Sequence, residues 1–227
     1  RFYFGRYNGS TPGSWRDIDL TPDRRKVEEL ADEMKRIADT MRNLHQTADD
    51  PSNDHFKSLT AGSEISFQEY FVQRHHSVPV SAVRFDGAES CQPGPGVIDA
   101  INDADLIVIA PSNPIVSIAP VLAVPGIRDA LIDRRNAVTA VSPIIAGAAL
   151  KGPADRMMAE LGHDASVLGI AALYKDFVST LIIDSKDSKQ KNAIEDLGLR
   201  CVVTETVMSK PGVSESLALT VLAGSNL

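Results

Sequence analysis

Two loops rich in small and polar residues carry side chains suited to binding phosphate. In the first, between residues 110 and 117, Ser112, Asn113 and Ser117 can donate hydrogen bonds to phosphate oxygens. Pro114 favours the start of a helix at this point, and the free N–H groups and dipole of a helix start attract anions. The alternative is that Asn113 and the serines only cap the helix. The sequence pattern favours neither interpretation over the other.

The second loop, between residues 142 and 156, is long and consists largely of small residues, which favours a functional role. We expect it to pack little of its own. Its glycines would allow close approach of a ligand, and its basic residues could supply positive charge. Its carboxylate could cap a helix or hold a metal ion. These candidates are Gly147, Lys151, Gly152, Asp155 and Arg156.

The elements that must position these loops alternate regularly from residue 106 onward. Strands are expected at 106–110, 137–141, 179–183 and 201–204, and helices at 117–135, 154–161, 189–197 and 213–222. Apolar strands alternating with helices predict an α/β fold, a Rossmann-like, doubly wound, mainly parallel sheet with helices on both faces. Ligands of such sheets bind beyond the carboxyl ends of the strands. Both loops and a polar segment at 204–206 follow strand ends, so we expect the site there.

The first part of the chain is organised differently. Residues 1–46 are expected to form an irregular leader and a long amphipathic helix from Thr21 to Leu44, and residues 47–227 the α/β core. The apolar stripe of this helix is expected to pack onto its own domain; the alternative is a second copy of the chain, in a homodimer. Further expected elements are a short helix at 66–74, a strand at 78–85 and a short helix at 97–102.

The composition excludes several classes of protein. Among 227 residues, 23 basic and 30 acidic side chains give a net charge of −7, which argues against a general nucleic-acid-binding protein. No apolar run reaches the roughly 18 residues that a membrane-spanning helix needs. Two cysteines cannot form a disulfide framework and fit a reducing cytoplasm. The sequence contains neither the glycine fingerprint of a nucleotide-binding loop nor zinc-ligand spacing. We expect a cytoplasmic protein without nucleic-acid or membrane partners.

Several strings together resemble one family, the 2-phospho-L-lactate transferases of deazaflavin coenzyme biosynthesis in their actinobacterial form. The strings in the second half of the chain are Ala110–Pro114 with Ser117–Leu122, Val141–Gly147, Lys151–Met158 and Met208–Ser209. Further upstream, Thr47–Pro51 resembles the family's "TDDPV" turn, and Ser66–Val72 resembles its "FQEYFV" segment. The resemblance covers about residues 47–225.

The resemblance implies a reaction. The family transfers a phospholactyl or phosphoenolpyruvyl group from a guanosine-diphosphate-activated donor to a ribityl hydroxyl of the deazaflavin precursor Fo. GMP leaves, and the next intermediate of coenzyme F-420 is formed. Such chemistry depends on positioning and on neutralising charge, and it needs no protein nucleophile. The expected partners are therefore the activated lactate or enolpyruvate and Fo.

The loop residues named above have expected roles in such a reaction. Lys151 and Asp155 are the expected catalytic residues, with Lys151 near the developing charge. The expected substrate-binding residues are Ser112, Asn113, Pro114, Ser117, Gly147 and Gly152. The family needs magnesium, for which the candidate ligands are Asp49 and Asp50.

One part of the family pattern is not found. The family begins with a strand, a Gly-rich loop and an "N-x-G-D-D" segment, and nothing before residue 47 matches them. One alternative is therefore a relative that binds guanine nucleotide without turnover. Another, from the sheet pattern alone, is a different sugar-nucleotide-dependent transferase.

Overall fold

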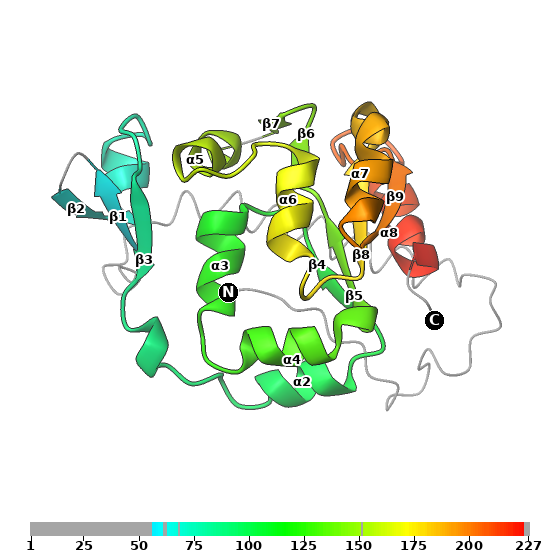
Figure 1. The fold of residues 1–227 in the computed structure, drawn as a ribbon, viewed down its shortest axis with the longest axis horizontal. Helices are drawn as coiled ribbons and strands as arrows, with labels where there is room; N and C mark the ends of the chain where they lie inside the picture. Colours follow the sequence, from blue (N-terminus) through cyan, green and yellow to red (C-terminus); the bar gives the residue numbers. More distant parts are fainter. Residues whose placement is uncertain (1–55, 61–62, 68, 151, 225–227) are drawn as a thin grey trace.

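The computed structural model describes residues 56–60, 63–67, 69–150 and 152–224 (Figure 1). The leader and helix expected within residues 1–46, and with them the homodimer contact, lie outside these ranges and stay predictions. Asp49, Asp50 and Lys151 also lie outside them.

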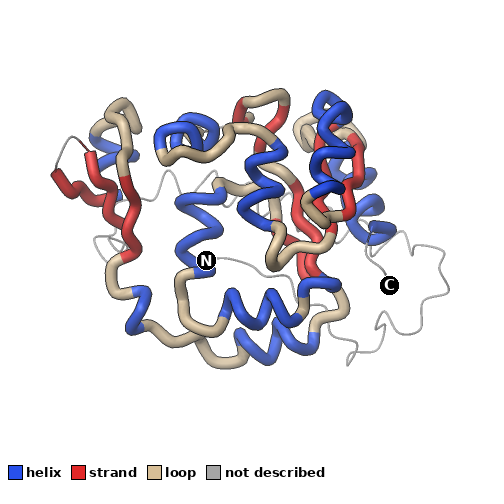
Figure 2. The backbone as a smooth tube through the Cα atoms, in the orientation of Figure 1, coloured by secondary structure: helices blue, strands red, loops and turns tan. Residues whose placement is uncertain are grey.

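A four-stranded parallel sheet forms the centre of the described structure (Figure 2). Its strands, in spatial order, are β4 (Ile107–Ile109), β5 (Val138–Val141), β8 (Thr180–Asp184) and β9 (Arg200–Thr204). All three neighbouring pairs are parallel, in a register that sets Ala140 opposite Leu181 and Leu181 opposite Cys201. Every residue of β5 and β8 is buried, which is why these segments read as continuous apolar runs.

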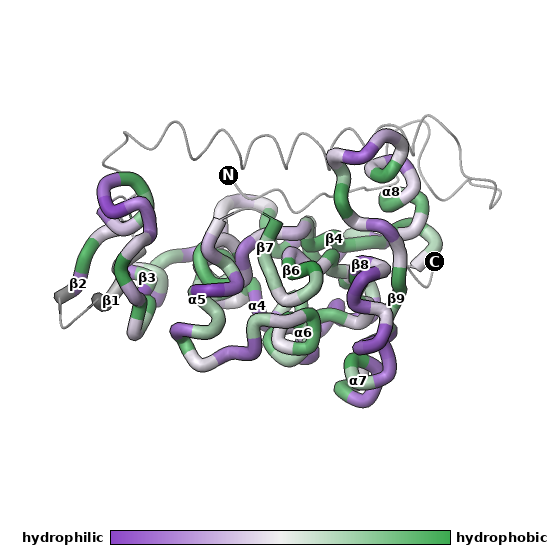
Figure 3. Tube along the Cα trace, turned by 90° about the horizontal axis from the view of Figure 1, so that it is seen from above, coloured by the Kyte–Doolittle hydropathy of each residue, from purple (hydrophilic) through white to green (hydrophobic). Residues whose placement is uncertain are grey.

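Helices cover both faces of this sheet. The helical segments are α2 (Val97–Asp103), η5 (Pro114–Ile118), α3 (Ala119–Leu122), α4 (Ile127–Asp133), η6 (Arg135–Ala137), α5 (Ala154–Glu160), α6 (Val167–Tyr174), η7 (Ser185–Gln190), α7 (Lys191–Asp196) and α8 (Val213–Gly224). One hydrophobic cluster joins alternate strand residues to α4, α5, α6 and α7, and a second joins the other face to α8. Figure 3 shows α8 across the sheet from α6 and α7. The expected α/β class, with helices on both faces, is confirmed.

The strands follow the order of the chain, and this arrangement explains how the helices are distributed. Right-handed crossovers between successive parallel strands that advance in one direction place all the connecting helices on one face. The connecting helices α4 to α7 accordingly share one cluster, and only α8, which follows the last strand, packs on the opposite face.

One expected helix differs in the structure, and one observed helix was not expected. The helix expected at 117–135 is broken after Leu122, and its halves meet at 90°. Pro125 lacks an N–H, and Gly126 has a left-handed φ of +85°. Helix α6 was not predicted, because nearly its whole circumference is buried and the amphipathic period is lost.

A small antiparallel sheet precedes the parallel one along the chain. Its strands are β1 (Phe56–Thr60), β2 (Ser63–Ser66) and β3 (Ala82–Phe85), in the order β2-β1-β3. A helical turn, η3 (Glu69–Gln73), stands where a short helix was expected, and a further turn, η4 (Ala88–Ser90), leads toward α2. In Figure 1 this sheet stands at the end of the molecule that is remote from α8, beside α5.

No single described helix is long and apolar enough to cross a membrane. Among the described helices, one bent pair, Pro114–Leu122 and Ile127–Asp133, reaches such a length and composition jointly.

Arg156 on α5 fastens the antiparallel part to the core. Its guanidinium donates hydrogen bonds to the Tyr70 hydroxyl at 3.1 Å, to the Val78 carbonyl at 3.2 Å and to the His76 carbonyl. Its Nε lies 3.0 Å from a carboxylate oxygen of Glu160, one turn further along α5. The sequence offered Arg156 as a free cation for a ligand; instead, these contacts occupy it.

Glu160 completes this clamp from the same helix. Its second carboxylate oxygen accepts a hydrogen bond from the N–H of Val80 at 2.8 Å. Tyr70, whose hydroxyl meets Arg156, is completely buried, and this burial raises the pKa of its hydroxyl despite the nearby guanidinium. Two adjacent side chains of α5 therefore bind a main-chain segment that lies about 80 residues earlier.

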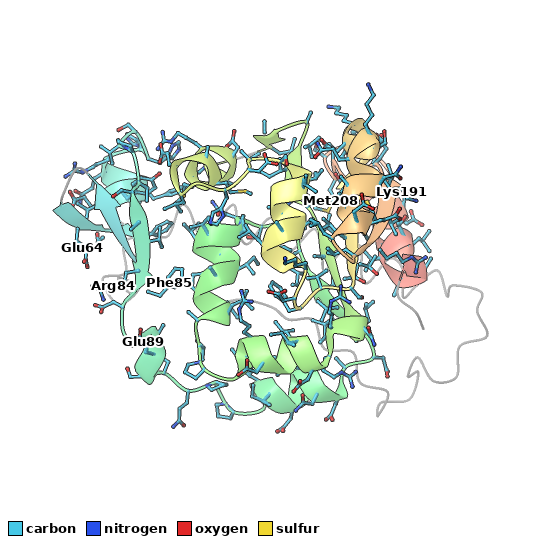
Figure 4. The ribbon with its side chains drawn as sticks, in the orientation of Figure 1. Glu64, Arg84, Phe85, Glu89, Lys191 and Met208 are labelled. Atoms are coloured by element: carbon cyan, nitrogen blue, oxygen red, sulfur yellow. The ribbon has the colours of Figure 1, made fainter. Side chains whose placement is uncertain are left out.

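Arg156→Ala should lower the free energy of unfolding by about 1.5–3 kcal/mol, since it removes hydrogen bonds from a charged donor and leaves two carbonyls and a carboxylate without their partner. Chemical denaturation of the full chain measures this. Arg84→Ala is the control: Arg84 pairs with Glu64 and Asp86 at the exposed edge of the small sheet (Figure 4), where ion pairs contribute little. Equal effects of the two substitutions would contradict the clamp.

Candidate functional site

The loops that leave the carboxyl ends of the parallel strands lie together at one edge of the sheet, uppermost in Figure 1. Helix α5 contacts both η5, which follows β4, and β7 (Ala148–Ala149), which follows β5. Segments separated by more than 30 residues are thereby brought to one place. This edge is where open parallel sheets bind ligands.

In the first loop, Asn113 acts as a helix cap. Its side-chain oxygen accepts hydrogen bonds from the N–H groups of Ile115 at 2.9 Å and Val116 at 3.3 Å. Pro114 is buried at the first helical position, and Ser112 is buried just before the cap. The capping interpretation is therefore confirmed for the Asn113 oxygen, and the N–H groups it binds are not free for an anion.

The amide nitrogen of Asn113 points toward α5. It lies 3.9 Å from the sulfur of Met157, which is a weak acceptor. Ser117 is half-buried, and its N–H is bonded to the Asn113 carbonyl at 3.0 Å. A phosphate oxygen would be a far better acceptor than the thioether for the Asn113 amide, so this donor stays available for a ligand.

The second loop is better ordered than its composition suggested. A short hairpin of β6 (Ile144–Ile145) and β7 occupies it, and both isoleucines are buried, so the expectation that this loop packs little of its own is wrong. The buried Ser142 hydroxyl donates to the Ile144 carbonyl at 3.0 Å. The hairpin turn is Ala146-Gly147, with φ of +51° and +77°, as two-residue hairpin loops with both central residues left-handed require.

The end of the second loop leads into α5. Gly152 has a φ of +73°, is exposed, and has open space where a side chain would stand. Asp155 is half-buried in the first turn of α5, where the helix dipole favours a negative charge. Lys151 lies outside the described residues, so its expected position near the phosphates stays a prediction.

The end of β8 and the segment that follows it hold buried carboxylates that the sequence reasoning did not consider. Asp184, only 1% exposed, accepts hydrogen bonds from the N–H and the hydroxyl of Thr206, both at 3.0 Å, and from the N–H of Lys186 at 3.1 Å. Burial alone would raise the pKa of Asp184. The hydrogen bonds from Thr206 and Lys186 outweigh that effect and hold the pKa below its ordinary value. Asp184 therefore ties the end of β8 to the segment after β9.

A second carboxylate of this segment reaches the hairpin. Asp187 is buried in η7, and its Oδ2 accepts a hydrogen bond from the N–H of Ala146 at 2.9 Å. At the surface, Glu205 receives hydrogen bonds from Lys210 at 2.6 Å and from the Ser185 hydroxyl, which lower the pKa of Glu205. An acidic residue directly after an apolar strand was the signal that could have drawn attention to Asp184.

Magnesium is not matched by a ligand set in the part of the chain that the structure describes. No group of three or more histidine, cysteine or acidic side chains suited to a metal ion occurs there. The candidate ligands Asp49 and Asp50 lie outside it.

Asp184→Asn should lower the free energy of unfolding at pH 7 by about 1.5–3 kcal/mol, because an amide cannot accept from donors on both of its sides. The folded pKa of Asp184 is depressed, so its contribution is present above the ordinary value of 3.8 and is lost as the pH falls through the folded pKa. Denaturation curves of both proteins at several pH values should therefore converge in acid. A difference that stays constant with pH would contradict this role.

Comparison with known proteins places these features in a family. The family model of the 2-phospho-L-lactate transferase CofD matches residues 21–211, a span that includes residues 21–46, which the resemblance described above left out. The 2-phospho-L-lactate transferase of Methanothermobacter thermautotrophicus is 40% identical over 160 residues, 70% of this chain and 51% of that protein. The phosphoenolpyruvate transferase of Kitasatospora aureofaciens is 38% identical over 160 residues, 70% of this chain and 50% of that protein.

Among solved structures, a member of the UPF0052 family from Bacillus halodurans is similar with a TM-score of 0.48 and 14% identity, covering 74% of this chain and 57% of that one. The chain spans about half the length of the curated relatives it matches. The family model, by contrast, matches most of the present chain. The chain belongs to the 2-phospho-L-lactate transferase family.

Proposed function

We propose that this chain transfers a phospholactyl or phosphoenolpyruvyl group from a guanosine-diphosphate-activated donor to a hydroxyl of Fo, with release of GMP, in coenzyme F-420 biosynthesis. Family membership, with relatives named 2-phospho-L-lactate transferase and phosphoenolpyruvate transferase, supports a transferase of this kind. The observation that carries the proposal is the contact of α5 with both η5 and β7, because these elements bring the proposed phosphate donors to one edge of the sheet.

In the proposed reaction, the Fo hydroxyl oxygen forms a bond to the phosphorus that bears the three-carbon acid. The bond from that phosphorus to the oxygen of the GMP phosphate breaks, and the hydroxyl proton is released. Ser112, the Asn113 amide and Ser117 would donate to the diphosphate, and Gly147 and Gly152 would let the main chain approach it. Neutral and charged donors that meet the developing charge lower the barrier to phosphoryl transfer.

Two further residues complete the proposed site. Lys151 would neutralise the charge that develops on the phosphate of the departing GMP, and Asp155 would take the proton from the attacking hydroxyl. Magnesium belongs to the proposal through the family resemblance, but no step is assigned to it, since the described residues offer it no ligand set.

A second candidate is guanine-nucleotide binding without turnover. It deserves a separate test because the chain spans only about half the length of its curated relatives. Turnover of Fo by the purified chain, followed as GMP release with either activated acid, separates the two candidates. GDP binding without GMP release under those conditions would favour the second.

Replacing Ser112 and Asn113 together by alanine should weaken GDP binding at least tenfold, because two neutral donors contribute about 0.5–1.5 kcal/mol each. Asn113→Asp is the matched variant: its carboxylate keeps the cap on Ile115 and Val116 but replaces the free amide donor with an acceptor. We expect it to melt like the parent chain and to bind GDP at least tenfold more weakly. If titration calorimetry shows unchanged GDP affinity in this variant, Asn113 serves only as a helix cap.

Lys151→Ala should slow Fo turnover about ten- to a hundredfold while GDP affinity changes little, since a charge-assisted contact made in the transition state is worth about 1.5–3 kcal/mol. Steady-state rates and calorimetry on the same preparation measure the two quantities. Lys175→Ala, on the loop after α6, serves as a control for the loss of one positive charge. Full turnover in Lys151→Ala would place this lysine outside the reaction.

A further inference from the structure

We propose that Asp187 is a positioning residue of the transfer site: its carboxylate holds the Ala146-Gly147 turn so that the N–H of Gly147 faces the bound phosphates. This inference rests on the proposed function, because it takes Gly147 to lie against the diphosphate. It adds a residue from the segment after β8 to a site otherwise drawn from the segments after β4 and β5.

The first support is the environment of the carboxylate. Asp187 is 4% exposed, and a buried carboxylate must be matched by hydrogen-bond donors to be tolerated. The N–H of Ala146, 41 residues earlier in the chain, donates to Oδ2 at 2.9 Å. The side chain therefore links two loops that the sequence keeps far apart.

The second support is the turn that it holds. The two-residue loop closes through the pairing of Ile145 with Ala148, which leaves the N–H groups of Ala146 and Gly147 outside the ladder. Asp187 binds the first of them. The second has no main-chain or side-chain acceptor among the residues that the structure describes, and Gly147 is exposed. The turn thus presents one unused donor to a ligand.

The third support is the conformation of Ala146. Its φ of +51° is unfavourable for a residue with a Cβ, and such conformations persist where the surroundings enforce them, often at functional sites. The two-residue hairpin loop requires this conformation, and the bond to Asp187 is made by the residue that adopts it. The main chain that carries Asp187 is itself held in place, because Asp184, at the N-terminal end of η7, is hydrogen-bonded to Thr206 and Lys186.

Asp187 has charged neighbours in the sequence. Lys186 and Lys189 stand on the same segment, and Asp184 precedes it. The hydrogen bond to Ala146 needs an acceptor oxygen rather than a negative charge, so an amide at position 187 should serve nearly as well. This distinguishes a positioning role from a charge effect on the substrate.

The experiment compares Asp187→Ala and Asp187→Leu, which remove the acceptor, with Asp187→Asn, which keeps one. Amide hydrogen exchange of Ala146, GDP affinity, and kcat and KM for transfer are measured on the full chain. The alanine and leucine variants should speed hydrogen exchange of the Ala146 amide at least tenfold and weaken GDP binding five- to tenfold. They should raise KM more than they lower kcat. Asp187→Asn should restore all of these quantities to within about threefold of the parent chain, as the shared acceptor predicts.

Glu195→Ala is the matched control. It removes an acidic side chain from α7 that pairs at 3.7 Å with Lys191, which is labelled at the surface in Figure 4. It should change neither the exchange of Ala146 nor GDP affinity. An equal response to Glu195→Ala would overturn the assignment to Asp187.

A measurement on the unaltered chain covers the case in which the variants fail to fold. Saturation with GDP should slow exchange of the Gly147 amide at least tenfold, and unchanged exchange would overturn the inference. Absence of GDP binding by the unaltered chain would overturn the proposed function together with the inference. Normal GDP binding by Asp187→Ala, in which the Ala146 amide has become exposed, would overturn the inference alone.

Discussion

Strands β5 and β8 are buried along their whole length. Polar side chains that are to reach a ligand must therefore come from the ends of these strands and the loops that follow. Their main-chain groups are paired with neighbouring strands, and their side chains fill two hydrophobic clusters on opposite faces. The polar groups of the candidate site therefore lie at one edge of the sheet, at the carboxyl ends of its strands. The position of the candidate site follows from this constraint before any individual contact is considered.

At that edge, hydrogen bonds to carboxylates supply the order that apolar packing supplies elsewhere. Asp184 joins the ends of β8 and β9, and Asp187 joins η7 to the β6–β7 hairpin. Burying a carboxylate without hydrogen-bond donors costs free energy of folding. Each of these hydrogen bonds therefore restricts the loop that provides the donor. Loops built largely from glycine, alanine and serine can in this way hold defined positions.

The sequence was informative where burial imposes a pattern. The four parallel strands were predicted because a strand buried on both faces must be apolar, and α5, α7 and α8 were predicted near their observed bounds. Helix α6 was not predicted, because burial on nearly all sides removes the alternation of apolar and polar residues that marks a helix. The break after Leu122 was not predicted, because it lies in a continuous apolar stretch. The β6–β7 hairpin escaped because Ala146-Gly147 lacks the usual turn asparagine.

Within the site, the sequence identified the loops but not the partners. It named Asn113 without deciding between cap and ligand donor, and the structure divides these roles between the oxygen and the nitrogen of one amide. It offered Arg156 as a free cation, although its partners lie about 80 residues earlier. It passed over Asp184, whose partner Thr206 is 22 residues away. A local signal can draw attention to one residue of such a long-range pair, but it does not identify the partner.

The clamp on α5 has a consequence for how this protein can change over evolutionary time. Arg156 and Glu160 grip mostly main-chain groups of residues 76, 78 and 80, which every amino acid presents except for the N–H that proline lacks. The hydrogen bonds at these three positions therefore survive a change of side chain, whereas the burial of Val80 and the packing of Val78 on the core still limit which side chains fit there. Among the described contacts of the clamp, Tyr70 contributes a side chain, so a change at position 70, 156 or 160 removes a hydrogen bond that a change of side chain at 76, 78 or 80 leaves in place.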